Sequence, residues 1–259
     1  MNDIKLSLGS NEDMPAIQML LAECHLSCEA VEWLAKNCIV AKAGSKLVGT
    51  VALEPFGRLG LLRSLAVRPS YRGQSVGRNL CTKMTSHARL LGVEELYLLT
   101  IDREPYLSKL GFQRLQDSEI PLQIRETGQF RFQCPRNAVC MKREIGHDAI
   151  YASSDLLRLR PDVPGARMWA VALQQTMLTY FEVSPRSRFE PHCHESEQIT
   201  MVLSGELFFE VQGMVHCVKP GEVIAIPSSA PHAVWTEALA ATAIDAWSPV
   251  MRKYGATKS

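Results

Sequence analysis

The chain has 259 residues, of which 21% are charged, and its formal net charge is +1. This balance excludes the strong positive field that draws proteins to nucleic acid or to an anionic membrane surface, so we expect neither as a partner. The length exceeds that of an ordinary single domain and predicts two. The sequence turns polar around Gly146. We therefore expect domains at residues 1–146 and 147–259.

The start of the chain, MNDIKLSLGS, lacks the basic segment and apolar core of a secretory signal. No apolar run reaches the roughly 20 residues of a membrane-spanning helix. The eight cysteines include no Cys-x-x-Cys pair, which favours reduced thiols over a disulfide framework. The sequence therefore predicts a cytoplasmic protein.

The N-terminal half alternates short strands and helices. Asn11 or Asp13 is placed to cap the first helix, and a Gly44-Ser45 turn separates two strands of a hairpin. The expected strands are 4–8, 39–43, 47–53, 61–67 and 96–101, and the expected helices are 14–24, 29–36, 76–91 and a short one within 103–111.

The stretch 61–91 is the first that indicates a site. An apolar strand ends before Pro69, a small-residue turn follows, and apolar residues then recur at helical spacing until Gly92. Such a turn presents free backbone N–H groups and the positive end of a helix dipole, which favour a pyrophosphate. An ordinary strand–loop–helix crossover has the same pattern, so both interpretations stay open.

This stretch resembles motif A of the GNAT N-acetyltransferases, whose R/Q-x-x-G-x-G/A loop binds the pyrophosphate of acetyl-CoA. Arg72 and Gly77 match the motif, and Ser75 stands at the middle glycine, where its N–H is still available. The resemblance implies acetyl-CoA as cofactor, with the strand end beside the pantetheine arm. The implied binding residues are Leu65, Ala66, Val67, Arg72, Gly73, Gln74, Ser75, Val76, Gly77 and Arg78.

Residues 103–112 resemble the family's F-Y-x-K-L-G-F segment, in which a tyrosine protonates the departing CoA thiolate. The matching position here is Leu107, and Tyr106 precedes it. One residue rotates a helical side chain by about 100°. Tyr106 is therefore either the general acid or a packing residue.

Residues 120–142 resemble the arsenic-resistance branch of the family, with its "IR…F…CP..AVCM.K" pattern. That resemblance implies a small amine as acceptor, including amino acids that carry phosphinate or arsinate. Amine acetylation needs a base, and Glu54 at a strand end is our candidate. Arg63 and Arg125 are placed to bind the acid end of such a substrate. The alternatives are a solvated glutamate and ordinary surface arginines.

From about residue 165 the pattern changes to short strands separated by turns, which predicts a β-barrel or sandwich. Gln212-Gly213 is the turn of one hairpin. The expected strands are 168–173, 177–183, 199–203, 207–211, 215–218 and 223–226.

Four possible metal ligands lie in this region. On an extended strand His192, His194 and Gln198 share one face, because side chains alternate. His232 follows Pro231 at the start of another strand. Three imidazoles and one oxygen suit a divalent transition metal such as Zn, Ni, Fe or Mn.

These residues resemble both cupin motifs, H-x-H-x-x-E-Q…G-E and P-G-E-x-x-x-I-P…P-H, with Gln198 at the position of the commoner glutamate. The resemblance implies a jelly-roll barrel with a bound metal. The tail 243–249 resembles the D-x-F-S-P-P-R ending of small cupins that linearise unsaturated uronic sugars. Asp245 matches that aspartate, whereas Met251 occupies the arginine position and Arg252 follows it.

The predicted fold class is α+β: a GNAT α/β fold with a mixed, mostly antiparallel sheet, then an all-β cupin barrel. We expect an enzyme that moves acetyl from acetyl-CoA to a small amine. One alternative is that the cupin is a metal or ligand sensor, or an oligomerisation module. Another is a degenerate acetyltransferase, with the cupin, for instance a uronate-type isomerase, as the active site. Unpaired barrel edges favour association, so we also expect a homodimer.

Overall fold

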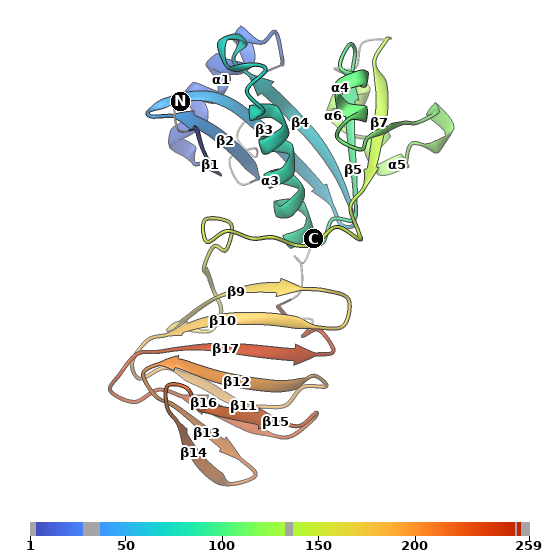
Figure 1. Cartoon of the computed structure of the whole chain (residues 1–259). Coiled ribbons are helices and arrows are strands. Elements are labelled where there is room, and N and C mark those ends of the chain that lie inside the picture. The colour runs from blue at the N-terminus through green and yellow to red at the C-terminus, as the bar shows by residue number, and fades with distance from the viewer. Residues whose placement is uncertain (1–3, 28–36, 133–136, 252, 255–259) are drawn as a thin grey trace. The chain divides into compact units, whose positions relative to one another are not determined.

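The computed structural model describes residues 4–27, 37–132, 137–251 and 253–254, and Figure 1 shows its elements. The chain divides into two compact units between Leu156 and Leu157. Each unit has its own sheets and its own buried clusters. The helix expected at 29–36 lies outside the described residues.

The N-terminal unit is built on a seven-stranded sheet in the order β1-β2-β3-β4-β5-β7-β6. Neighbouring strands are antiparallel except β4 and β5, which run parallel. The predicted mixed, mostly antiparallel sheet is therefore confirmed. Its strands are β1 (Ile4–Leu8), β2 (Cys38–Ala43), β3 (Lys46–Phe56), β4 (Leu59–Val67), β5 (Glu95–Thr100), β6 (Gln113–Arg114) and β7 (Val139–Glu144).

Helices cover both faces of this sheet. The helical spacing of Val76, Leu80 and Met84 gives α3 one apolar side, which packs in a cluster with Ile39 of β2. The next residue of that strand, Val40, points to the other face and packs in the cluster of α1. The helical segments are η1 (Asn11–Asp13), α1 (Met14–Glu23), η2 (Pro69–Tyr71), α3 (Val76–Leu90), α4 (Glu104–Ser108), η3 (Asp117–Glu119), α5 (Leu122–Arg125) and α6 (Gly128–Phe132).

The C-terminal unit consists of a six-stranded sheet, β15-β12-β17-β10-β9-β8, and a four-stranded sheet, β11-β16-β13-β14. Buried residues of both sheets, such as Phe181 and Phe209, form one core cluster. Within the described residues the strands form these two sheets and no single closed barrel. The strands are β8 (Arg160–Pro161), β9 (Ala166–Ala172), β10 (Met177–Val183), β11 (Arg188–His192), β12 (Glu197–Ser204), β13 (Leu207–Val211), β14 (Met214–Val218), β15 (Val223–Ile226), β16 (His232–Trp235) and β17 (Ala241–Ser248).

The turn between β13 and β14 has the predicted form. Gln212 and Gly213 have φ angles of 50° and 78°, and Val211 pairs with Met214 across them. Positive φ at both central residues matches the right-handed twist of the two strands. The hairpin is therefore fixed by local sequence.

The segment 147–156 packs on the N-terminal unit. Leu156 is buried in the cluster that contains α3, and Asp155 forms an ion pair of 2.8 Å with Lys83. The division of the chain thus falls after residue 156, later than the boundary expected after residue 146. Polar composition marks a linker but does not reveal the unit on which it packs.

No helix in the described ranges combines the length and the apolar character needed to span a bilayer. The cysteines at 24, 38, 81, 140, 193 and 217 form no disulfide with one another.

Candidate functional site

The parallel strands β4 and β5 separate soon after they begin. Residues 59–61 pair with residues 95–97, and Figure 1 shows the strands diverging beyond that point. Ser64 has a φ angle of 54° and lies where the register between β3 and β4 shifts. Such a bulge bends a strand and increases its twist, so β4 turns away from β5. The predicted pantetheine-binding main chain, residues 65–67, follows this bend.

The loop before α3 contains two residues in the left-handed conformation, Gly73 at φ 77° and Ser75 at φ 60°. Ser75 is the N-cap of the helix. A left-handed residue other than glycine costs roughly 1–2 kcal/mol, which explains why glycine suits this position and how serine still adopts it. Nε of Arg72 donates to the Val67 carbonyl at 3.0 Å and ties the loop to the end of β4.

Tyr106 reaches the N-terminus of α3. A Cβ atom added at Gly77 would lie 2.8 Å from the Tyr106 hydroxyl and 3.6 Å from Val67. Burial raises the pKa of Tyr106, Cys81 raises it further, and Arg78 opposes them. The hydroxyl thus stays protonated at neutral pH, beside the predicted phosphate loop.

The predicted base Glu54 and the predicted substrate-binding residue Arg63 lie together. Nη1 of Arg63 donates to Glu54 at 3.0 Å, and both side chains are largely buried. Glu54 is the cross-strand partner of Leu61, where the ladder between β4 and β5 ends. Arg125 lies at the end of α5 and donates to the Asp117 carbonyl. The structure therefore brings Glu54 to Arg63, while Arg125 contacts a different loop.

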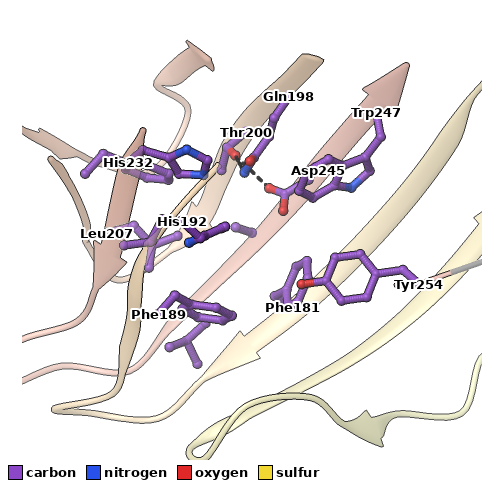
Figure 2. A pocket seen from close by; sticks show the side chains of 14 residues that line it. Phe181, Phe189, His192, Gln198, Thr200, Leu207, His232, Asp245, Trp247 and Tyr254 are labelled. Atoms are coloured by element: carbon purple, nitrogen blue, oxygen red, sulfur yellow. Dashed lines mark hydrogen bonds between the residues drawn. The ribbon is translucent and has the colours of Figure 1, made fainter. Parts of the chain in front are cut away.

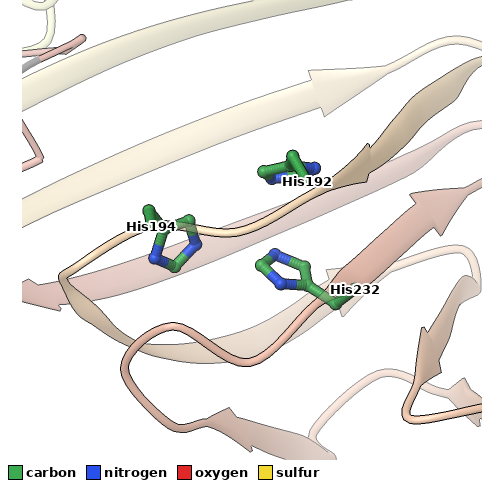
Figure 3. Close-up of side chains that lie close together, drawn as sticks. All are labelled: His192, His194 and His232. Atoms are coloured by element: carbon green, nitrogen blue, oxygen red, sulfur yellow. The ribbon is translucent and has the colours of Figure 1, made fainter.

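The C-terminal unit gathers the three predicted histidines, and Figure 3 shows their rings around one space. One nitrogen from each of His192, His194 and His232 lies within 4.8 Å of the others. His192 and His232 are direct cross-strand partners on β11 and β16. His194 lies in the loop after β11, where its carbonyl accepts from the Ser229 amide at 2.8 Å.

The prediction that His192, His194 and Gln198 share one face of one strand is wrong. β11 ends at His192 in the four-stranded sheet, and Gln198 is on β12 in the six-stranded sheet. The chain crosses between the sheets in residues 193–196. The residues meet because this crossing closes one end of the core, and alternation along a strand plays no part.

Hydrogen bonds to the main chain orient all three rings. Each Nδ1 donates to a carbonyl: His192 to Glu190 at 2.7 Å, His194 to Ser196 at 2.7 Å, and His232 to Ala230 at 2.9 Å. Each Nε2 is then left with a lone pair, as in histidines that bind metals. Burial lowers the pKa of His232 and the other two histidines lower it further, against the hydrogen bond to Ala230.

Gln198, on β12, is the fourth candidate metal ligand. Its Oε1 lies 3.2 Å from His194 Nε2, and its Nε2 donates to Thr200 at 2.9 Å. Thr200 in turn donates to Asp245 on β17 at 2.7 Å (Figure 2). Burial raises the pKa of Asp245 to about 7, opposed by the hydrogen bonds from Thr200 and Gln198.

A cavity of about 40 Å³ lies beside these groups, lined on its other sides by apolar residues such as Phe181, Phe189 and Leu207 (Figure 2). Among the described residues no lysine or arginine lines it. Met251 and Lys253 line the adjoining pocket, and Arg252 lies outside the described residues. The cavity thus combines a ligand cluster with apolar walls.

Sequence reasoning missed two features of these sites. Thr200 is two residues after Gln198 and shares its face, so the strand period could have indicated it. The bulge at Ser64 had no such signal, because serine is not a residue that predicts positive φ.

Comparison with known families agrees with this geometry. Residues 13–112 match the model of the acetyltransferase (GNAT) family, and residues 179–244 match that of the cupin domain. The chain thus joins a GNAT acetyltransferase domain to a cupin domain. The narrower arsenic-resistance branch stays a prediction.

Among relatives, the amino-acid acetyltransferase of Edwardsiella ictaluri is 30% identical over 99 residues, which are 38% of this chain and 22% of that protein. The N-acetylglutamate synthase of Neisseria gonorrhoeae, solved with coenzyme A and N-acetyl-glutamate, is 24% identical with a TM-score of 0.50 and covers 56% of this chain and 36% of that one. KdgF from Halomonas sp. is 22% identical with a TM-score of 0.38, over 40% of this chain and 96% of that one. The chain spans only about a fifth of the curated relatives it matches.

Proposed function

We propose that the N-terminal unit transfers the acetyl group of acetyl-CoA to the amine of a small amino acid. The observation that carries this proposal is the match of residues 13–112 to the acetyltransferase family. The separation of β4 from β5 beside the left-handed loop supports this proposal, because it leaves the main chain of β4 available to acetyl-CoA.

Acetyl-CoA would bind along this split. The first N–H groups of a helix have no partner inside the helix, so those that follow Ser75 suit the pyrophosphate. Gly73, Gln74, Val76 and Arg78 belong to the same loop and helix start. The bend at Ser64 would admit the pantetheine arm between the strands, beside Leu65, Ala66 and Val67.

Glu54 is the proposed base. The acceptor amine must lose a proton before its nitrogen attacks the thioester carbonyl, and a carboxylate takes that proton. The ion pair with Arg63, at 3.0 Å, holds the Glu54 side chain beside the end of the β4–β5 ladder. The nitrogen–carbon bond then forms and the carbon–sulfur bond breaks.

Tyr106 is the proposed donor to the CoA thiolate that leaves. A protonated phenol within reach of the sulfur would restore the thiol. Its raised pKa favours the protonated form, and its hydroxyl lies close to Gly77 in the segment that we propose to bind the cofactor.

Two arginines are the proposed contacts for the acid end of the acceptor: Arg63, which pairs with Glu54, and Arg125, which contacts a different loop. Arg63 and Arg125 carry fixed positive charges that suit a carboxylate, phosphinate or arsinate. The curated relatives are amino-acid acetyltransferases. Glutamate is therefore the first acceptor to test, followed by amino acids that carry phosphinate or arsinate.

For the cupin domain we propose a divalent transition metal held by His192, His194, His232 and Gln198. The residues fit such an ion, because one nitrogen from each histidine lies within 4.8 Å of the others and the Gln198 amide oxygen lies 3.2 Å from His194 Nε2. A metal there would act as a Lewis acid on a bound oxygen. The described wall of the cavity holds no lysine or arginine, whereas Lys253 lines the adjoining pocket together with His192 and His194, so the uronate interpretation stays a prediction.

The deciding experiment measures CoA release from acetyl-CoA with the amine panel, with and without a chelator. We expect turnover with at least one amino acid and the same rate after chelation. Turnover that falls on chelation would favour the cupin as a sensor. No turnover together with no acetyl-CoA binding would favour a degenerate acetyltransferase.

The homodimer stays a prediction that sedimentation would test. The edge strands of the two C-terminal sheets are β8, β11, β14 and β15.

A further inference from the structure

A short chain of buried hydrogen bonds stands behind the histidine cluster. It runs from Gln198 through Thr200 to Asp245, over distances of 2.9 Å and 2.7 Å (Figure 2). The three residues are 5%, 1% and 6% exposed. Thr200 and Asp245 are direct cross-strand partners on β12 and β17, so the sheet register itself fixes their contact.

The direction of these bonds determines how the Gln198 amide lies. With Asp245 ionised, Thr200 donates its one hydroxyl hydrogen to that carboxylate, and the Thr200 oxygen accepts from Gln198. The NH₂ end of the amide therefore faces Thr200. The carbonyl end, Oε1, is left facing the histidines.

This orientation brings two acceptors together. His194 Nδ1 must carry a hydrogen because it contacts the Ser196 carbonyl. In a neutral ring Nε2 is then a lone pair, and it lies 3.2 Å from the lone pairs of Gln198 Oε1. His194 is half-buried and Gln198 is buried, and two acceptors at this distance repel each other unless a proton on the ring or a metal ion lies between them.

We propose that Thr200 and Asp245 are positioning residues for the metal proposed above. They hold the Gln198 amide with its oxygen toward the three histidines and so make Gln198 the fourth ligand. A glutamate would need no such support, because both atoms at its end are oxygens. A glutamine has one oxygen and one NH₂ group, and a half-turn would point two hydrogens at the ion.

The test is metal affinity, measured on the full metal-stripped chain by titration with Zn²⁺ and with Ni²⁺. Thr200→Val removes the hydroxyl and keeps the shape. We expect it to weaken binding about 10- to 100-fold, the usual effect of losing a group that supports a ligand. Thr200→Ser restores the hydroxyl and should bind within about threefold of the parent. Thr200→Ala replaces the valine variant if that one fails to fold.

The matched control is Thr179→Val. Thr179 is also buried, and it is the β10 partner of Asp245, but its hydroxyl accepts from the Trp247 ring nitrogen at 2.8 Å. This variant loses an equivalent buried hydroxyl and should keep the parent's affinity.

A cycle with Gln198→Ala separates positioning from general damage. If Thr200 acts through Gln198, Thr200→Val should cost little in the Gln198→Ala background. Equal losses in both backgrounds would overturn the proposal, as would a Thr200→Val variant that binds like the parent. A parent that binds neither ion would overturn both this proposal and the metal site. Acetyl transfer is measured separately, so its failure is distinguishable from either.

Discussion

The site of the N-terminal unit consists mainly of main chain, whereas that of the C-terminal unit consists of side chains. In the first, a bulge, a left-handed loop and a helix start create the opening. In the second, three rings and an amide from both sheets converge on one point. A main-chain site depends on backbone conformation and a side-chain site on residue identity. The two should therefore respond differently to single substitutions.

Ser75 illustrates the difference. It occupies a position where the family has glycine and still adopts φ 60°. The N–H group that the loop needs is present in either residue. An equivalent change at His232 would remove a ligand atom outright.

Glu54→Gln should have the largest effect, and it tests a place where the N-terminal site depends on a side chain. Loss of a positioned base typically slows a reaction about 10²- to 10⁴-fold, so kcat should fall in this range while acetyl-CoA affinity is kept. Steady-state kinetics and CoA titration measure the two separately. Glu94→Gln is the control, because Glu94 also pairs with an arginine, Arg58, and should leave kcat unchanged. An unchanged kcat in Glu54→Gln would remove Glu54 as the base.

His232→Ala should weaken Zn²⁺ binding at least about 100-fold, more than the loss of a supporting group, because it removes a ligand. Titration of the metal-stripped chain measures this. His216→Ala is the control, since His216 is exposed on β14 and lies outside the cluster. CoA release by His232→Ala should equal that of the parent. Parallel losses of metal binding and acetyl transfer would contradict the separation of the two sites.

Gly77→Ala tests how closely the main-chain site is packed. The added Cβ would lie 2.8 Å from the Tyr106 hydroxyl, so either the tyrosine or the start of α3 must move. We expect acetyl-CoA affinity to fall about tenfold, or 1.4 kcal/mol, and isothermal titration measures it. The Tyr106→Phe background should recover part of the loss by removing the hydroxyl. Gly128→Ala, where a Cβ meets nothing within 4 Å, is the control. If Gly77→Ala keeps the parent's affinity for acetyl-CoA, the Tyr106 side chain can move aside without loss of binding.

The sequence predicted the side-chain site better than the main-chain site. The histidines at 192, 194 and 232 could be identified from the sequence as candidate ligands. The prediction that His192, His194 and Gln198 share one strand face was wrong, because residues 193–196 cross between sheets. The loop around Ser75 was indicated by its glycines, but the bulge at Ser64 was not. Pairing across sheets and local strain depend on tertiary contacts, which no local pattern encodes. The ion pair of Glu54 with Arg63 likewise follows from the register of β3 and β4.

Asp13→Asn should have the smallest effect, and it tests whether the two units unfold independently. Asp13 forms an ion pair of 2.6 Å with Lys42 and accepts from the Ser10 amide and hydroxyl. Burial opposes the charge, but these contacts outweigh it and lower the pKa of Asp13. A lowered pKa means that the unfolded chain binds the proton more tightly. The charge therefore stabilises the fold above the unfolded pKa, and this contribution is lost as pH falls through the folded one.

At neutral pH the asparagine variant should lose about 1 kcal/mol of unfolding free energy, because the ion pair with Lys42 is lost and the hydrogen bonds from Ser10 no longer reach a charged group. The difference from the parent should shrink as the solution is acidified through the lowered pKa. Calorimetry of the full chain measures both. Asp102→Asn, at an exposed ion pair with Arg103, should change stability by less than about 0.5 kcal/mol. Within the described residues, the ion pair and hydrogen bonds of the Asp13 side chain lie in the N-terminal unit. Metal affinity of the cupin should therefore not change, and a shift in that affinity would mean that the two units are coupled.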